Sequence, residues 1–259
     1  MNLPFLPKRT TKPRQTGIAM VMDKSLSLRE AEDLIASAGH LIDFLKLGFG
    51  TSLVAQQVPE KIKAYQKADI RVYLGGTLFE AFIIRDMFDE YRKYVDKLGL
   101  DTIEISDGSM MMEHDVKCEY IHKLAKDYLV LSEVGSKESG IMIAPNRWIE
   151  MMQKELQAGS FKVIGEARES GNVGIYRPTG KAHVTLINKI LSKVQSDKII
   201  WEAPLKSQQV WFIRHFGANV NLGNIPAQEV IPLETLRIGL RTDTFFQYLP
   251  PKMKKYQPK

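Results

Sequence analysis

Four glutamates stand at the carboxyl ends of short apolar runs in this sequence. They follow one another at intervals of 29, 33 and 36 residues and are Glu104, Glu133, Glu166 and Glu202. One strand, one helix and two loops take about that length. Carboxylates can bind a divalent cation or exchange protons, and a buried carboxylate cannot remain ionised alone. The repeated position therefore predicts an acidic site built by successive strand–helix units.

Basic side chains occur at comparable points of the chain. Lys46 lies in an apolar run, while Lys137 and Arg168 closely follow two of the glutamates. They could form buried ion pairs that only stabilise the fold. Alternatively, the cations could bind an anionic substrate while the carboxylates hold a hard ion, Mg²⁺ most naturally. The number of charged residues at consecutive run ends favours a functional site.

Two further segments could bind phosphate. Gly75 and Gly76 join a run to a helical pattern, where free N–H groups attract anions, although a glycine pair is also an ordinary tight turn. Lys206 begins a later helical pattern, and Asn221 and Gly223 follow the last run, at positions where barrels often bind phosphate. The motifs GxxxxGK[ST], GxGxxG and HExxH are absent from the sequence.

Eight apolar runs are the expected strands, and helical patterns separate them. The runs are Gly17–Asp23, Phe44–Gly48, Ile70–Leu74, Thr102–Ser106, Tyr128–Glu133, Lys162–Arg168, Lys198–Glu202 and Asn219–Leu222. The helices expected include Leu28–Ala38, capped by Ser27, and a long one over Thr77–Leu98. Near-continuous apolar runs are typical of parallel strands covered on both faces. We predict one (β/α)8 TIM barrel over residues 1–259, with an open doubly wound sheet as the alternative.

Composition limits the other functions. The net charge of +6 comes largely from the chain ends, which we expect to be short, basic and flexible. No aromatic-plus-basic motif accompanies the charge, so we predict no nucleic-acid binding. No apolar run is long enough for a membrane helix and no signal peptide is evident, which favours a cytoplasmic protein. Apolar residues on the 77–98 helix predict a homo-oligomer.

The strand ends resemble those of the phosphosulfolactate synthase family. The motifs are Lys-Leu-Gly-Phe-Gly-Thr-Ser (46–52), Val-Tyr-Leu-Gly-Gly-Thr-Leu (72–78), Ile-Glu-Ile-Ser-Asp-Gly-Ser (103–109), Glu-Val-Gly-Ser-Lys (133–137), Glu-Ala-Arg-Glu-Ser-Gly (166–171), Glu-Ala-Pro-Leu-Lys-Ser-Gln-Gln (202–209) and Asn-Val-Asn-Leu-Gly-Asn-Ile (219–225). The resemblance implies a barrel that adds sulfite to phosphoenolpyruvate with Mg²⁺, forming (2R)-phospho-3-sulfolactate for coenzyme M or sulfolactate synthesis. Another phosphate-binding barrel lyase and a non-catalytic, stress-related family member are the alternatives.

This chemistry suggests a role for each candidate residue. We expect Lys137 to protonate C2 as the general acid, with Lys46 as the alternative. The expected metal ligands are Glu104, Glu133, Glu166 and Glu202. The expected substrate-binding residues are Arg168, Lys206, Gly75, Gly76, Ser106, Asn221 and Gly223.

Overall fold

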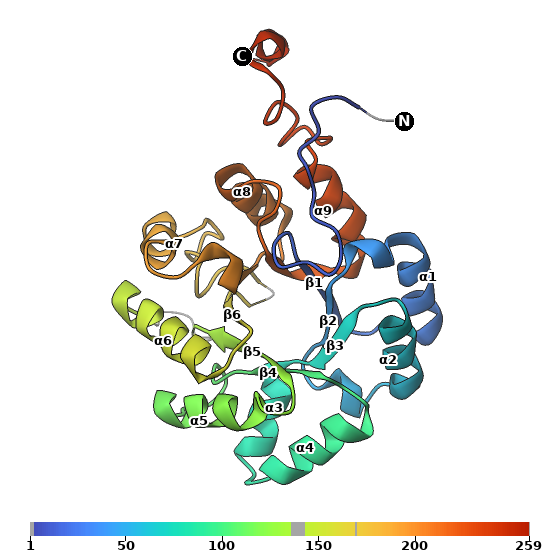
Figure 1. Ribbon diagram of the computed structural model, residues 1–259, viewed down its shortest axis with the longest axis vertical. Coiled ribbons are helices and arrows are strands. Elements are labelled where there is room, and N and C mark those ends of the chain that lie inside the picture. The colour runs from blue at the N-terminus through green and yellow to red at the C-terminus, as the bar shows by residue number, and fades with distance from the viewer. Residues whose placement is uncertain (1–2, 136–142, 169, 259) are drawn as a thin grey trace.

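A computed structural model describes residues 3–135, 143–168 and 170–258. Strands and helices alternate along the chain, and the helices surround the strands (Figure 1). The strands are β1 (Ala19–Asp23), β2 (Phe44–Leu47), β3 (Arg71–Leu74), β4 (Thr102–Ile105), β5 (Leu129–Val134), β6 (Lys162–Gly165), β7 (Ile199–Glu202) and β8 (Leu222–Pro226). The α-helices are α1 (Leu28–Ala38), α2 (Val58–Lys67), α3 (Gly76–Ile83), α4 (Phe88–Lys97), α5 (His114–Leu124), α6 (Pro145–Ala158), α7 (Val184–Leu191), α8 (Lys206–Phe216) and α9 (Val230–Arg237).

The strands form a parallel barrel. Hydrogen-bonded neighbours follow the order β3-β2-β1-β8-β7-β6-β5-β4, and β3 contacts β4 across the remaining side. This confirms the predicted (β/α)8 TIM barrel. All eight carboxyl ends therefore lie at one end of the barrel, where this fold places its chemistry.

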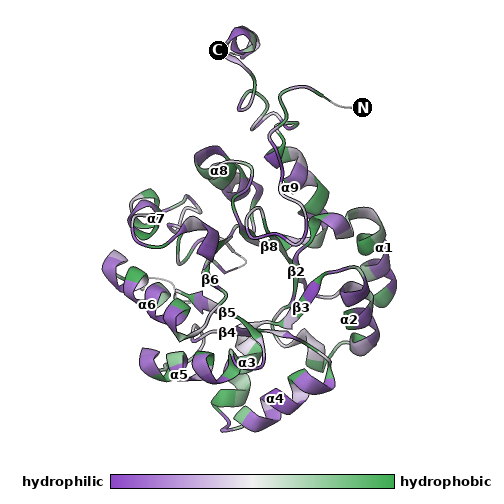
Figure 2. Ribbon diagram, in the orientation of Figure 1, coloured by the Kyte–Doolittle hydropathy of each residue, from purple (hydrophilic) through white to green (hydrophobic). Residues whose placement is uncertain are grey.

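Two apolar layers result from the period-two alternation of strand side chains. Inside the barrel, Met20, Phe44, Tyr73, Leu131 and Ile164 belong to one buried cluster. The opposite faces of the strands pack against the helices in a larger cluster. Figure 2 shows that the surrounding helices carry both hydrophobic and hydrophilic residues, as expected of helices with one face on a core.

The long helix predicted over Thr77–Leu98 is wrong, because the chain turns between α3 and α4. Asp86 has a positive φ of 56°, and the N–H of Met87 donates to the carbonyl of Phe82 at 3.0 Å. Apolar periodicity continues across this turn because both helices contribute to one aromatic cluster. The rings of Phe79 and Tyr91, for example, meet edge to face at 5.4 Å.

The eighth strand also differs from the prediction. The expected run over Asn219–Leu222 shares only Leu222 with β8. Asn221 instead lies before the strand, where its side chain accepts from the N–H of Ile18 at 3.1 Å and donates to the carbonyl of Ile199 at 3.1 Å. Main-chain pairing continues beside these bonds, since the carbonyl of Asn221 accepts from the N–H of Trp201 at 3.1 Å. Regular strand β8 begins only at Leu222 and includes Asn224.

The amino-terminal basic residues are used in the fold. Arg9 pairs with Glu234 at 2.8 Å, and Arg14 pairs with Asp43 at 3.0 Å. Lys12 donates to the carbonyl of Asp69 at 2.8 Å. This segment therefore packs against the amino end of the barrel, and both chain ends extend from the side of α8 and α9 (Figure 1).

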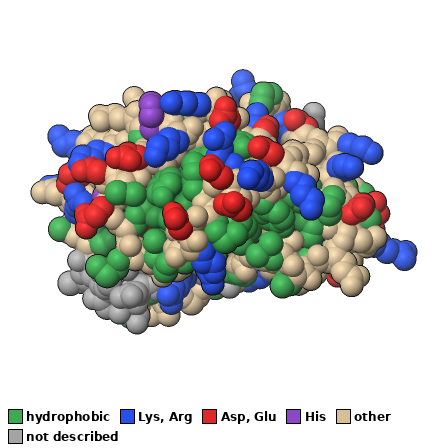
Figure 3. Space-filling view, turned by 90° about the horizontal axis from the view of Figure 1, so that it is seen from below, with side chains coloured by type: hydrophobic (Ala, Val, Ile, Leu, Met, Phe, Trp, Pro, Cys, Tyr) green, Lys and Arg blue, Asp and Glu red, His purple; other side chains and the backbone are tan. Residues whose placement is uncertain are grey.

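The surface and the helices can be compared with the predictions of a homo-oligomer and of no membrane helix. Figure 3 shows an apolar area, bordered by charged side chains, on the side where α4 and α5 lie. Phe79 and Tyr91, two aromatic residues of the segment behind the homo-oligomer prediction, are fully buried within the protein. Homo-oligomerisation therefore stays a prediction. In the part of the chain that the structure describes, no helix has the length and apolar character needed to span a membrane.

Candidate active site

A buried lysine lies at the centre of the carboxyl end of the barrel. The Nζ atom of Lys46 is 3.0 Å from Glu104, 3.5 Å from Glu133 and 3.6 Å from Glu202. The side chains of Lys46 and these glutamates are at most 8% exposed. Their positions on β2, β4, β5 and β7 face inward by alternation, above the apolar cluster that includes Tyr73 and Leu131.

One lysine and three glutamates lie together here, and burial and charge shift the pKa values of several of them. Burial alone would lower the pKa of Lys46, but Glu104, Glu133 and Glu202 outweigh it and hold the pKa well above its ordinary value. Burial raises the pKa of Glu104, and Lys46 only partly offsets this. Burial also raises the pKa of Glu202 to about 7. The one ammonium therefore does not fully offset the burial of these two carboxylates, and the pKa of Glu202 lies near neutral pH.

A pH dependence of stability follows from Glu202. Its pKa is higher in the folded protein (about 7) than its ordinary value of 4.5, so between these values the folded state binds more protons than the unfolded chain. Raising the pH from 4.5 to 7 should thus lower the free energy of unfolding, by on the order of 3 kcal/mol, relative to Glu202→Gln. Urea unfolding of both proteins in EDTA tests this. Parallel pH profiles would contradict it.

Glu166 and Arg168 extend the site beyond β6. The N–H of Arg168 donates to Glu166 Oε1 at 2.7 Å, while the N–H of Ala167 donates to Glu202 Oε2 at 2.8 Å. Arg168 has a positive φ of 48° and is exposed. The backbone after β6 thereby orients two carboxylates and turns a guanidinium towards the opening.

These residues line a cavity of about 450 Å³ at the carboxyl end. The predicted site residues on its wall are Lys46, Gly75, Glu104, Glu133, Glu166, Arg168 and Glu202. Its other residues are Met22, Phe49, Thr77, Ser109, Ser170 and Asn224, which were not among the candidates. Phe49 and Asn224 share the positive φ of Arg168, with values of 53° each. Phe49 closely follows β2, and this position was the available sequence signal for it. Asn224 lies within β8, so the correct bounds of that strand were needed to find it.

The remaining candidates lie elsewhere. Lys206 pairs with Asp243 at 2.6 Å, and Ser106 donates its hydroxyl proton to Glu80. Gly223 faces the barrel interior, where a Cβ atom would come within 2.5 Å of Met20. Together with Asn221, these residues are not on the wall of the cavity. Lys137, the expected general acid, lies outside the described residues.

Gly76, the second residue of the glycine pair, binds a carboxylate of the site through its main-chain N–H. The N–H of Gly76, at the start of α3, donates to Glu104 Oε1 at 2.6 Å. The positive end of the helix dipole therefore stabilises an internal carboxylate. This contact leaves Glu104 Oε2 directed to Lys46, and it takes one of the N–H groups that the sequence suggested for phosphate.

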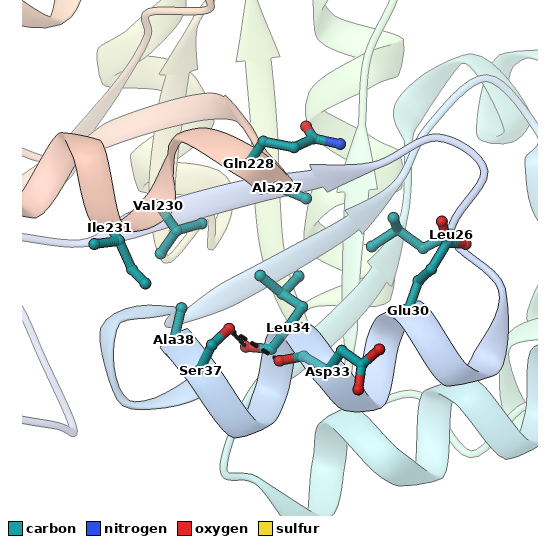
Figure 4. A pocket seen from close by; sticks show the side chains of 10 residues that line it. All are labelled: Leu26, Glu30, Asp33, Leu34, Ser37, Ala38, Ala227, Gln228, Val230 and Ile231. Atoms are coloured by element: carbon teal, nitrogen blue, oxygen red, sulfur yellow. Dashed lines mark hydrogen bonds between the residues drawn. The ribbon is translucent and has the colours of Figure 1, made fainter.

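A second cavity, of about 300 Å³, lies between α1 and the start of α9 (Figure 4). Two of its polar side chains already have partners. Glu30 accepts from the N–H of the helix cap Ser27 at 2.8 Å, and the hydroxyl of Ser37 donates to the carbonyl of Asp33 at 2.9 Å. The charged cavity around Lys46 is therefore the better candidate for chemistry.

Known proteins are similar to this chain over most of its length. The family model described as (2R)-phospho-3-sulfolactate synthase matches residues 7–243. The chain belongs to the phosphosulfolactate synthase family. A phosphosulfolactate synthase of Bacillus subtilis is 42% identical over 93% of this chain and 97% of its own. One of Methanocaldococcus jannaschii is 43% identical over 89% of this chain and 94% of its own.

This member of the phosphosulfolactate synthase family also has more distant similarities, one to a plant protein and one to a solved barrel structure. Protein HEAT-STRESS-ASSOCIATED 32 of Arabidopsis thaliana is 20% identical over 88% of both chains. The structure of 3-hexulose-6-phosphate synthase from Salmonella typhimurium has a TM-score of 0.53 at 14% identity, covering 86% of this chain and all of that one. At that identity the similarity concerns the barrel alone.

The family resemblance implies Mg²⁺, so the side chains of the site can be compared with the ligands that this ion prefers. Among the described residues, no group of three or more acidic, histidine or cysteine side chains is arranged to hold a metal by itself. Mg²⁺ usually takes one or two carboxylates and completes its shell with water and substrate oxygens. Glu166 Oε2 and Glu202 Oε1 are buried oxygens that accept no hydrogen bond from the described residues, and Glu202 Oε1 also lies 3.6 Å from the Lys46 ammonium. These residues fit Mg²⁺ shared with a substrate.

Proposed function

We propose that this protein is a phosphosulfolactate synthase, a carbon–sulfur lyase class enzyme that joins sulfite to phosphoenolpyruvate. The identity to relatives of that name over nearly the whole chain supports this proposal. The observation that carries it is the buried Lys46 ammonium among carboxylates on the wall of one cavity. We also propose that the protein is cytoplasmic, because both substrates are small soluble anions.

The reaction places defined demands on the residues. The sulfur lone pair of sulfite forms a bond to C3, the C2–C3 double bond breaks, and its electrons move towards C2 and the carboxylate. A proton must then reach C2. Lys46 carries a proton at neutral pH because its pKa stands well above the ordinary value, and it faces the cavity. It is the proposed acid among the described residues, while Lys137 stays the sequence-based alternative.

Charge balance supports a metal in this proposal. Four glutamates line the cavity with two described cations, Lys46 and Arg168. Anionic substrates would be repelled by this excess of carboxylate unless a cation lay between them. Glu166 and Glu202 would hold Mg²⁺, which when bound stabilises negative charge developing on the substrate carboxylate. Arg168, at the opening, is the proposed partner of sulfite or phosphate.

The decisive experiment is an assay of the purified protein with Mg²⁺, phosphoenolpyruvate and sulfite. We expect phospho-3-sulfolactate, detected by mass spectrometry, and its loss when EDTA is added. A higher turnover with another nucleophile would instead support a different barrel lyase. Failure to bind phosphoenolpyruvate in calorimetry would support the non-catalytic, stress-related alternative.

The metal proposal predicts a separable effect of Glu166. Glu166→Gln should weaken Mg²⁺ binding at least about tenfold in the presence of phosphoenolpyruvate, because an anionic ligand becomes neutral. Calorimetric titration with Mg²⁺ measures this without turnover. Glu119→Gln, which changes an exposed glutamate of α5, is the matched control. Equal Mg²⁺ affinities for the two variants would remove Glu166 from the metal site.

A further inference from the structure

A second buried lysine lies directly behind the site. Lys117 of α5 has a side chain only 1% exposed. Its Nζ atom is 2.9 Å from Asp107 in the segment after β4 and 2.9 Å from Glu155 in α6. The same atom donates to the main-chain carbonyl of Glu133 at 2.5 Å. Its three partners thus come from three different parts of the barrel.

Glu133 therefore connects two buried ammonium groups. Its carboxylate lies 3.5 Å from Lys46 inside the barrel, and its carbonyl accepts from Lys117 on the outside. Because these groups belong to one residue, a shift of the carbonyl also shifts the carboxylate. Glu155, another partner of Lys117, also contacts His114, whose Nε2 atom lies 3.2 Å from Glu155 Oε1.

We propose that Lys117 is a positioning residue for the reaction, which fixes the end of β5 so that Glu133 stays against Lys46. This inference rests on the proposed function. If Lys117 were merely structural, it would attach α5 and α6 to the barrel, and its substitution would change stability alone. Removing one partner of a buried ion pair lowers stability in either case, so stability does not separate the two roles. A displacement of about 1 Å in an active site can lower turnover about a hundredfold, so turnover does separate them.

Lys61 provides a matched control. It is also a buried helical lysine, with a side chain 3% exposed, paired with the carboxylate of Asp23 at 2.8 Å and with the carbonyl of Leu26 at 2.7 Å. Asp23 is the last residue of β1 and Leu26 follows that strand. Neither residue lines the cavity around Lys46. A variant at Lys61 thus removes a similar ion pair and a similar hydrogen bond without touching a proposed catalytic group.

The experiment compares Lys117→Met with Lys61→Met by kinetics and thermal unfolding. We expect both to lower Tm, but only Lys117→Met to lower kcat, by about 10- to 100-fold, with KM for phosphoenolpyruvate within about threefold of the original. Equal kcat values for the two variants in an active enzyme would overturn this inference alone. An inactive unsubstituted protein would overturn the proposed function, and this inference with it.

A milder variant covers the case in which Lys117→Met does not fold. Asp107→Asn removes one charged partner of Lys117 at a side chain that is 21% exposed. It leaves the contacts with Glu155 and the carbonyl of Glu133 in place. We expect kcat to fall about three- to tenfold while Tm changes little. An unchanged kcat would contradict the positioning role.

Discussion

Replacing Lys46 with methionine is expected to lower kcat by about a thousandfold or more. The substitution keeps a similar length but removes the ammonium that lies within 3.0–3.6 Å of three glutamates. It therefore removes the proposed proton donor and leaves a cavity wall of uncompensated carboxylates facing anionic substrates. General acid catalysis alone contributes about 100- to 10,000-fold.

The same substitution should also destabilise the protein. Breaking a buried ion pair by removing one partner typically costs about 3–5 kcal/mol, because the remaining charge is left in the interior. Burial raises the pKa values of Glu104 and Glu202, which can therefore take up protons, so the loss should be smaller at pH 5 than at pH 8. Urea unfolding at the two pH values separates this effect from the kinetic one.

A buried lysine at the opposite end of the barrel is the control for Lys46. Lys162 begins β6, and its ammonium donates to the carbonyls of Gln15 and Asp197 at 3.1 and 2.6 Å. Lys162→Met removes a buried cation of the barrel without changing the carboxyl end. We expect it to lower Tm while kcat stays within about twofold. If Lys46→Met retained more than a tenth of the original turnover, Lys46 would not be the acid.

The inward direction of the charged side chains was predictable from the sequence. Glu104 sits between Ile103 and Ile105, so alternation alone puts it on the face opposite to two residues that meet the helices. The same rule places Lys46 and Glu202 inside the barrel. Parallel strands then bring their carboxyl ends together, although the residues are far apart in the chain.

Other features depend on contacts that a linear pattern does not contain. Asn221 lies in a run that predicts a strand, but it precedes β8, and its side-chain amide forms hydrogen bonds with the main chain of Ile18 and Ile199. Lys117 lies in a helix whose periodicity only predicts burial, and its partners come from three distant segments. The turn at Asp86 is hidden because the apolar pattern continues through it. In each case tertiary contacts decide between local alternatives of similar free energy.

Substituting Gly76 with alanine is expected to be damaging to both stability and turnover. A Cβ atom there would lie 2.7 Å from the Cβ of Ser106, closer still to its hydroxyl, and 3.0 Å from Glu104 Oε1. Ser106 and Glu104 are fully buried, so α3 and β4 would have to separate. We expect a loss of about 3 kcal/mol in the free energy of unfolding, the upper range for overpacking.

Turnover should fall as well, because the N–H of Gly76 fixes Glu104 at 2.6 Å and Glu104 contacts Lys46. A shift of about 1 Å would lower kcat about 10- to 100-fold. Gly99→Ala is the control for backbone effects. Gly99 has a positive φ of 67° with no atom within 4 Å of an added Cβ, so it should cost only about 1 kcal/mol and leave kcat unchanged.

A double variant tests whether steric contact with Ser106 is the cause. Ser106→Gly removes the two atoms closest to the added methyl group, although it also removes the hydrogen bond to Glu80. If the contact dominates, Gly76→Ala should cost at least about 1 kcal/mol less in the Ser106→Gly background than in the original protein. Additive losses would show that the clash lies elsewhere. Turnover should stay low in the double variant, because Glu104 Oε1 still lies 3.0 Å from the new methyl group and must move.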